Sequence, residues 1–101
     1  MRIAVMGAGG VGGYFGALLA RAGHEVTFVA RGAHLAAIQQ HGLRVESTLD
    51  GTFTVPGRAV GDTTQAGPQD LVLFTVKMYD NGAALAATEP LLGDDTIVLT
   101  L

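Results

Sequence analysis

The sequence contains no cysteine and little charge, and these two shortages exclude several classes of protein. Without cysteine, the chain has no disulfide scaffold, no thiolate zinc site and no cysteine nucleophile, and a reducing, cytoplasmic location fits its composition. The six basic residues are scattered singly and the formal net charge is −3, so no patch could neutralise several phosphates of DNA or RNA. The chain instead has 49% apolar residues in a length of 101, enough for one hydrophobic core but not two.

A long uncharged stretch from Ile3 to Ala20 has to be weighed as a membrane span or a signal peptide. Its eighteen residues can cross a bilayer, and the run Ala20-Arg21-Ala22 resembles a cleavage site. Gly12 and Gly16 also have the spacing of the small residues found in membrane helix dimers. Against this, six glycines fall within residues 7–16, and each costs a helix interior about 1 kcal/mol relative to alanine. We therefore expect no membrane segment.

The first thirty residues have the apolar pattern of a strand, a helix and a second strand. Residues 2–6 form a short apolar run that ends at a glycine, which is typical of a strand buried on both faces. A helix is expected from Gly10 to Ala22, with Gly23 in the position of a helix cap. Residues 25–30 predict a second strand, parallel to the first and joined to it by a right-handed crossover. The expected apolar stripe of the helix consists of Val11, Phe15, Leu18, Leu19 and Ala22.

The rest of the chain continues the alternation and adds a hairpin. A weaker helix is expected at 33–41, and period-two alternation around Asp50-Gly51 then predicts an antiparallel hairpin over 43–55. The remaining expected elements are strands near 59–60 and at 71–76, a helix at 80–92 and a last strand at 96–101. Together they predict an α/β fold, a Rossmann-like parallel sheet with helices on both faces and a small antiparallel hairpin insertion. The apolar run that closes the sequence suggests a single domain, residues 1–101, cut from a longer protein.

The strongest chemical signal is the run Gly7-Ala8-Gly9-Gly10-Val11-Gly12, which leaves the first predicted strand and opens the first predicted helix. This G-x-G-x-x-G pattern is typical of dinucleotide-binding turns: Gly7 allows the tight turn, Gly9 lets the backbone approach a pyrophosphate, and Gly12 lets the helix pack on the strands. Backbone N–H groups and the positive end of the helix dipole would then bind the phosphates. The alternative is a glycine-rich turn that serves packing only.

The end of the second predicted strand indicates which dinucleotide binds. An acid about 20 residues after the glycines would accept a hydrogen bond from the ribose 2′-hydroxyl of NAD, but this sequence has Arg31 there. Glu25 lies at the other end of the strand, and the next acid is Glu46. The planar guanidinium of Arg31 suits the 2′-phosphate of NADP. The alternative is an ordinary exposed arginine in a loop.

Lys77 is the single lysine of the chain and follows the apolar strand that ends at Val76. Ligands of open parallel sheets bind beyond the carboxyl ends of the strands, and this lysine is expected there. It could reach a cofactor ribose or an anionic substrate, or it could be a solvated lysine at the start of a loop. His34 and His41 lie seven residues apart with no carboxylate nearby, so we expect a solvated surface and no metal site.

Taken together, these residues closely resemble the amino-terminal domain of the ketopantoate reductases (2-dehydropantoate 2-reductases). The resemblance is carried by Met6-Gly7-Ala8-Gly9-Gly10-Val11-Gly12-Gly13, Ala22-Gly23-His24-Glu25-Val26, Ala30-Arg31-Gly32 and Asp70-Leu71-Val72-Leu73 running to Val76-Lys77. Members of this family use NADPH to reduce the 2-oxo group of ketopantoate to pantoate, on the route to coenzyme A. The resemblance implies that residues 7–12 hold the pyrophosphate, that Arg31 holds the 2′-phosphate, and that Lys77 beside Val76 lines the junction of cofactor and substrate.

The same resemblance implies what these residues would not do alone. The next family motif, an asparagine followed by glycine, would come after Leu101, and the family's helical second domain supplies a catalytic lysine and a substrate-binding glutamate. No catalytic residue is therefore assigned within the 101 residues. We expect the isolated chain to bind NADPH without turnover, and to self-associate through the apolar surface left by the cut.

Two other functions stay open at this point. One is a non-catalytic nucleotide-sensing module, like the regulatory Rossmann domains of ion-transport systems, although those usually keep an acid where this chain has Arg31. The other is a related enzyme that shares the fingerprint, such as a hydroxyacid or glycerol-phosphate dehydrogenase.

Overall fold

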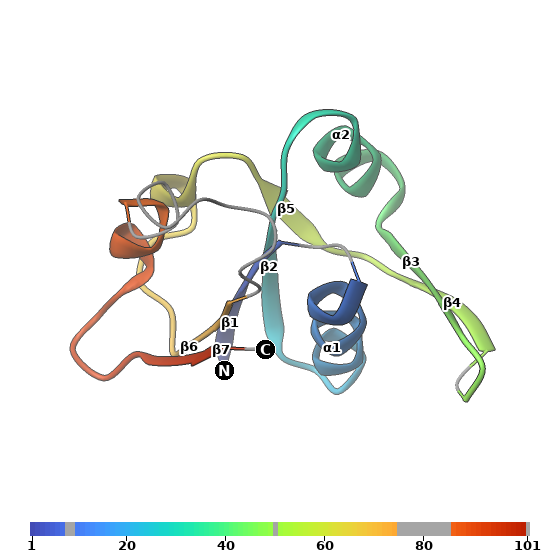
Figure 1. Cartoon of the computed structure of the whole chain (residues 1–101), viewed down its shortest axis with the longest axis horizontal. Coiled ribbons are helices and arrows are strands. Elements are labelled where there is room, and N and C mark those ends of the chain that lie inside the picture. The colour runs from blue at the N-terminus through green and yellow to red at the C-terminus, as the bar shows by residue number, and fades with distance from the viewer. Residues whose placement is uncertain (8–9, 50, 75–85, 101) are drawn as a thin grey trace.

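The fold is built on a parallel sheet of five strands in the order β5-β2-β1-β6-β7 (Figure 1). A computed structural model describes residues 1–7, 10–49, 51–74 and 86–100. Each neighbouring pair of strands in the sheet is parallel, as the sequence predicts. The strands are β1 (Arg2–Met6), β2 (Glu25–Val29), β5 (Arg58–Val60), β6 (Leu71–Phe74) and β7 (Ile97–Thr100).

Strand β1 lies at the centre of the sheet and is fully buried from Ile3 to Met6. Such burial on both faces requires a run of apolar residues without alternation, which is what this segment has. Its amino end is fixed by Asp70, whose N–H donates to the Arg2 carbonyl and whose Oδ2 accepts from the Arg2 N–H, both at 2.8 Å. These two bonds join the start of β1 to the start of β6.

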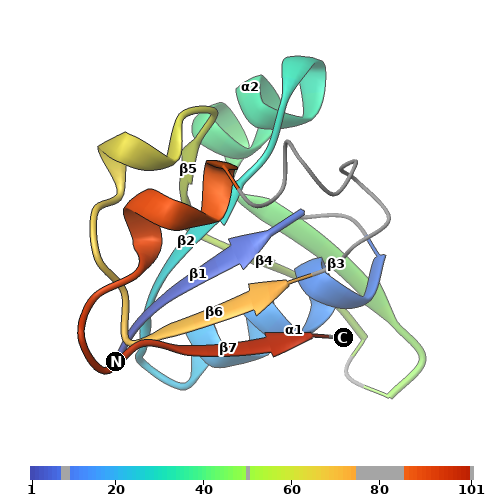
Figure 2. The ribbon, with the colours of Figure 1, turned by 60° about the vertical axis from the view of Figure 1, so that its left-hand side comes forward.

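Two hydrophobic cores lie on opposite faces of the sheet, and helical segments cover both faces, as expected (Figure 2). Helices α1 (Gly10–Arg21) and α2 (Gly32–His41) cover the first core, and the 3-10 helices η1 (Thr63–Gln65) and η3 (Glu89–Leu91) cover the second. The first core consists of Ile3, Val5, Ala17, Val26, Phe28, Ala30, Ile38, Leu43, Val45, Val55, Ala59 and Leu73. The second core consists of Ala4, Met6, Val29, Val60, Ala66, Val72 and Leu91.

Helix α1 buries a different side from the one its large apolar residues predict. Val11 and Phe15 were expected in the core, but they are 58% and 44% exposed, whereas Gly16 and Ala17 are buried. The reason is the short distance between the helix and the sheet, which leaves room for small side chains only. Leu19 packs against the first core from a half-buried position.

The predicted hairpin forms a second, two-stranded antiparallel sheet of β3 (Leu43–Ser47) and β4 (Gly51–Val55). Leu43, Val45 and Val55 belong to the first core, and both strands of the hairpin contact α1. The Arg21 guanidinium of α1 lies 4.3 Å from the centre of the Phe53 ring, which fastens the hairpin to the helix. Asp50, placed at the turn by the sequence, is outside the described residues.

Other boundaries differ slightly from the predicted ones. Only the end of the helix expected at 80–92 is described: residues 86–88 are helical and η3 follows, with Pro90 unable to donate an N–H. The strand expected at 71–76 is described as far as Phe74, and the last strand runs from Ile97. Among the described helices, none has the length and apolar character needed to cross a membrane.

Candidate functional site

The strand order identifies the edge of the sheet where a ligand is expected. Residues 1–60 build the sheet outward from β1 on one side, through β2 to β5, and the later strands β6 and β7 extend it on the other side. In open parallel sheets, ligands bind beyond the carboxyl ends of the strands at such a switch point, here between β1 and β6. Met6, Val29, Val60 and Phe74 end the four strands around this point.

Gly7, the residue that follows β1, has a backbone conformation typical of the start of a dinucleotide-binding turn. Gly7 has φ +93°, a left-handed conformation that residues with a Cβ rarely adopt. Its N–H donates to the Val29 carbonyl at 3.1 Å, which ties the turn to β2. Helix α1 then begins at Gly10 and has no acid in its first turn, so its free N–H groups meet no negative charge of the helix's own.

Gly16 explains how closely α1 approaches the sheet. A Cβ at this position would lie 2.7 Å from Phe28 Cε1 and 2.8 Å from Val5 Cγ2, closer than real Cβ atoms come to other atoms. The sequence reasoning gave this packing task to Gly12, which is also buried, and it missed Gly16. The four-residue spacing of Gly12 and Gly16 is the signal that could have found it, because it places both on one helix face.

Arg31 follows β2 at the same edge, as predicted. The Ala30 N–H donates to the Val60 carbonyl at 3.1 Å, and Arg31 then continues in an extended conformation, with φ −136° and ψ 157°, as the N-cap residue of α2. Its side chain is exposed. Glu25 lies at the opposite end of β2, where it pairs with Arg2 at 3.6 Å. The end of β2 therefore presents a cation where an acid would favour NAD.

Gly32 continues this edge with a second left-handed glycine. Its φ is +60°, and no atom lies within 4 Å of the position that a Cβ would take, so the backbone is open on that side. Helix α2 begins at Gly32 without an acid in its first turn. The first turns of α1 and α2 thus resemble each other in charge, which suits an anionic ligand.

Asp62 is a polar residue of this edge that the sequence reasoning did not single out. It follows β5 and caps η1: its Oδ1 accepts from the Thr64 N–H at 3.0 Å and from Thr64 Oγ1 at 2.8 Å. These hydrogen bonds, the side-chain one foremost, lower the pKa of the Asp62 carboxyl, so it stays ionised. The pattern Asp-Thr-Thr after a short strand is the capping signal that could have revealed it.

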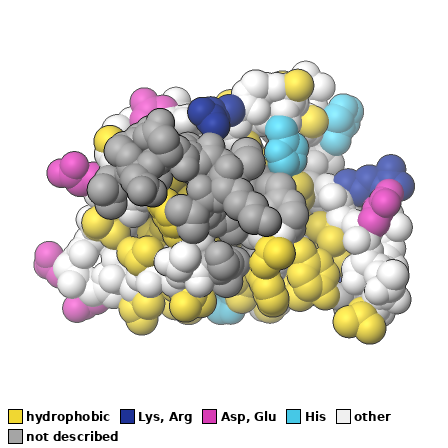
Figure 3. Space-filling view, viewed as in Figure 1, with side chains coloured by type: hydrophobic (Ala, Val, Ile, Leu, Met, Phe, Trp, Pro, Cys, Tyr) yellow, Lys and Arg dark blue, Asp and Glu magenta, His cyan; other side chains and the backbone are white. Residues whose placement is uncertain are grey.

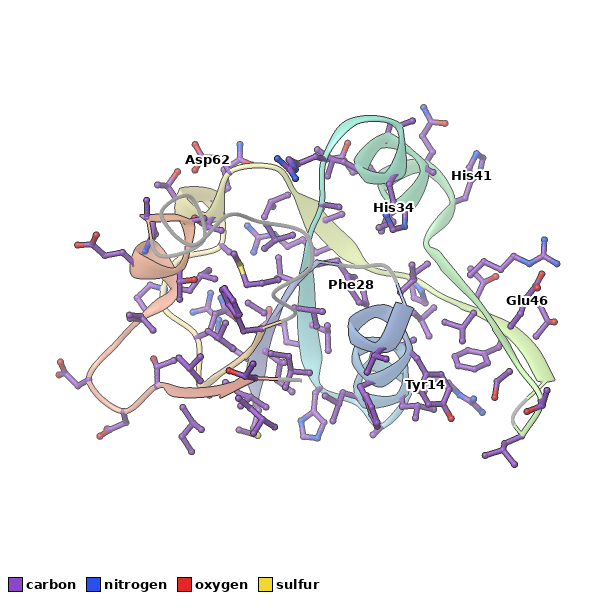
Figure 4. All side chains as sticks on the ribbon, in the orientation of Figure 1. Tyr14, Phe28, His34, His41, Glu46 and Asp62 are labelled. Carbon is purple, nitrogen blue, oxygen red and sulfur yellow. The ribbon has the colours of Figure 1, made fainter. Side chains whose placement is uncertain are left out.

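A groove of about 700 Å³ lies between α1, α2 and the hairpin. Tyr14 and His34 border it, and an ion pair of Arg44 with Glu46 at 3.2 Å lies along its hairpin side (Figure 4). His34 and His41 are both exposed, as expected. In the part of the chain that the structure describes, no three histidine or acidic side chains gather as a metal would need.

The predicted site residues divide into those that the structure describes and those that it does not. Gly7, Gly10, Val11, Gly12 and Arg31 are described, and they lie around the carboxyl ends of β1 and β2. Ala8, Gly9, Val76 and Lys77 lie outside the described residues.

Comparison with known proteins gives a consistent family. The family model "Ketopantoate reductase PanE/ApbA" matches residues 3–101. The chain is 45% identical over 102 residues to a 2-dehydropantoate 2-reductase of Mesorhizobium japonicum, covering 100% of this chain and 31% of that relative. The chain thus spans about a third of the length of the curated relatives it matches.

Solved structures of similar proteins share the fold. The crystal structure of 2-dehydropantoate 2-reductase from Geobacter metallireducens superposes with a TM-score of 0.90 at 40% identity, covering 100% of this chain and 33% of that one. A D-mandelate dehydrogenase in a ternary structure with NADH and anilino(oxo)acetate gives a TM-score of 0.85 at 28% identity, with the same coverage.

Proposed function

Because the chain belongs to the ketopantoate reductase family, we propose that its residues 1–101 form the NADPH-binding domain of an enzyme that reduces a 2-oxo acid, most directly ketopantoate to pantoate. The observation that carries this proposal is the joint geometry of two strand ends. A left-handed Gly7 leads from β1 into α1, and Arg31 extends from β2 beside it. A pyrophosphate binds at a glycine turn before a helix N-terminus, and an arginine after the second strand accommodates a 2′-phosphate.

Within that function, the chain's own residues bind and orient the cofactor. The N–H groups at the start of α1 would bind the pyrophosphate, with Gly7 to Gly12 keeping side chains out of the way, and Arg31 would pair with the 2′-phosphate. Lys77 stays a predicted contact at the junction of cofactor and substrate, beside Val76. A nicotinamide held by these residues would supply hydride for reduction of the oxo group, and no described residue is assigned as the acid that would protonate the oxygen.

The preference for NADPH over NADH tests this proposal. The unmutated chain is expected to bind NADPH more tightly, and Arg31→Ala to remove most of the difference, about 1 to 3 kcal/mol for a charge-assisted contact. Calorimetric titration with both cofactors measures it. Arg44→Ala is the matched control, because this exposed arginine pairs with Glu46 on the hairpin and should leave the preference unchanged. Equal affinities in the unmutated chain would contradict the assignment of NADP.

A second candidate function is favoured by one structural neighbour. The D-mandelate dehydrogenase structure holds NADH and an oxo acid analogue on the same fold, so a hydroxyacid dehydrogenase that uses NADH is the alternative. The calorimetric comparison separates the two, because tighter binding of NADH would favour this alternative. A purely nucleotide-sensing module is the less favoured reading, because Arg31 occupies the position where such modules usually keep an acid.

We further propose that the chain works in the cytoplasm and that it self-associates when isolated. Hydrophobic side chains gather along the border of the molecule where β7 and α1 lie (Figure 3). Ile97 and Leu99 are 62% and 49% exposed on β7, which pairs on one side with β6 in the described sheet. An exposed apolar edge strand of this kind promotes pairing with another chain.

A further inference from the structure

Arg31 and Asp62 follow neighbouring strands at the carboxyl edge of the sheet, Arg31 two residues after the end of β2 and Asp62 two residues after the end of β5. The register pairs Val29 with Val60, and the hydrogen bond from Ala30 N–H to the Val60 carbonyl at 3.1 Å belongs to this last pair of the ladder. Beyond this pair Arg31 is extended, with φ −136° and ψ 157°, whereas the chain bends at Gly61 and Asp62, and Asp62 has φ −111° and ψ 118°. Because neighbouring strands run about 4.8 Å apart, the two segments leave the sheet from neighbouring positions.

The two side chains also leave the sheet on the same face. Side chains alternate between the faces along a strand. Val29 and Val60 both point into the second core, whereas Ala30, the next residue of β2, points into the first. Arg31, extended after Ala30, therefore returns to the side of the second core, and Asp62 caps η1, which covers that same core. A ligand group held by Arg31 therefore lies within reach of Asp62.

The carboxylate of Asp62 is fixed in place with one oxygen available. Oδ1 takes both hydrogen bonds from Thr64, and Oδ2 takes none among the described residues. The loop after it is held from two sides, by the Arg58 guanidinium donating to the Gln65 carbonyl and by Arg2 Nη2 donating to the Ala66 carbonyl at 2.9 Å. Lowered in pKa by its hydrogen bonds to Thr64, the carboxyl is ionised and can only accept hydrogen bonds.

The chemistry of the dinucleotide indicates what this oxygen meets, given the proposed function on which this inference rests. The base is attached to the ribose carbon next to the one that carries the 2′-phosphate, so a phosphate on Arg31 brings the base to the neighbouring strand end. Adenine has one hydrogen-bond donor on its edge, the 6-amino group. We propose that Asp62 recognises the adenine of the cofactor by accepting a hydrogen bond from this amino group on Oδ2. Asp62 is then a specificity-determining residue for the base.

The experiment compares NADPH with reduced nicotinamide hypoxanthine dinucleotide phosphate, in which a carbonyl oxygen replaces the 6-amino group. The unmutated chain should bind NADPH about tenfold more tightly or better, since a hydrogen bond to a charged group is lost and two acceptors face each other. Asp62→Asn keeps the Oδ1 acceptor and the cap, and it should reduce the preference to less than about twofold. The Asp62→Asn substitution also removes a negative charge, which affects the binding of both ligands equally. The readout is therefore the ratio of their two dissociation constants.

Thr64→Val is the matched control. It removes the Oγ1 donor to Asp62 but keeps the carboxylate and the Thr64 N–H, so it should retain the preference for NADPH. Circular dichroism on each variant checks that the fold is unchanged. An unmutated chain without preference, or an Asp62→Asn variant that keeps it, would overturn the proposal.

Two further outcomes are distinguishable from these. If Asp62→Asn left the base preference intact and changed the ratio of NADPH to NADH affinity, Asp62 would act by orienting Arg31, and base recognition would be refuted. If the unmutated chain bound no dinucleotide at all, the proposed function itself would fail, and this inference with it.

Discussion

The contact of α1 with the sheet gives the sharpest prediction, which is that adding one methyl group at Gly16 destabilises the fold. In Gly16→Ala, the new Cβ would meet Phe28 Cε1 at 2.7 Å and Val5 Cγ2 at 2.8 Å, and neither side chain has any exposed surface through which to move away. Overpacking of this kind costs about 1 to 3 kcal/mol. Alanine also regains about 1 kcal/mol of helix propensity.

Because the new Cβ meets two fully buried side chains, the steric cost lies in the upper part of this range, about 2 to 3 kcal/mol, and the net loss in unfolding free energy is about 1 to 2 kcal/mol. For a domain of this size, such a loss lowers the melting temperature by roughly 5 to 15 °C. Thermal and urea unfolding followed by circular dichroism measure both quantities. Ala37→Gly, at an exposed position within α2, reports the glycine–alanine difference in the same protein without a packing change.

A double-mutant cycle isolates the steric part of the effect. Combining Gly16→Ala with Val5→Ala removes one of the two colliding side chains, so the two substitutions together should cost less than the sum of their separate costs, by about 0.5 kcal/mol or more. If Gly16→Ala instead stabilised the chain by the amount that Ala37→Gly destabilises it, α1 would not lie against the sheet as described.

Three further results are expected. Gly12→Val should abolish NADPH binding in a folded but less stable chain, because a branched side chain hinders both the approach of the phosphates and the packing of α1. Cofactor titration and circular dichroism on one sample test this, and undiminished binding would mean that the glycines serve packing only. The unmutated chain should show concentration-dependent association in sedimentation experiments, and Phe15→Glu or Leu99→Glu on the exposed apolar surface should reduce this association. A chain that is monomeric at all concentrations would contradict the prediction. Incubation of the chain with NADPH and ketopantoate should give no oxidation of NADPH above a no-protein control, since no described residue orients the substrate; the absorbance of the reduced nicotinamide measures this. Steady oxidation of NADPH that Lys77→Ala abolishes would show that the catalytic groups had been assigned to the wrong part of the protein.

The sheet and the hairpin could be predicted because their signals are local. Residues 3–6 and 71–74 are uninterrupted apolar runs, which are typical of a strand covered on both faces. The alternation from Leu43 to Val55 specifies a strand pair with one apolar side. Arg31 could be placed at the edge of the sheet because it closely follows the short strand β2, which itself closely follows α1, so few alternative alignments of β2 against β1 are possible. Its place there needed no knowledge of tertiary contacts.

The orientation of α1 and the role of Asp62 could not be predicted in the same way. Apolar periodicity favours the side of a helix with the largest side chains, but α1 packs through Gly16 because the distance to Phe28 decides which residues fit. Asp62 precedes a helix of three residues, too short to show any period. Its relation to Arg31 arises only when β5 pairs with β2, a contact between segments that are distant in the sequence.

The hydrogen bonds between Asp70 and Arg2 have a consequence for the order of folding during synthesis. Strand β1 is made first and lies in the middle of the sheet, and it can pair with β2 as soon as the first strand–helix–strand unit has left the ribosome. Its other edge finds no partner until residues 70–74 emerge, when Asp70 aligns β6 against it. Pairings between such distant segments form slowly. A nascent chain that pauses before Leu71 therefore exposes an open apolar strand edge, which promotes aggregation until β6 is made.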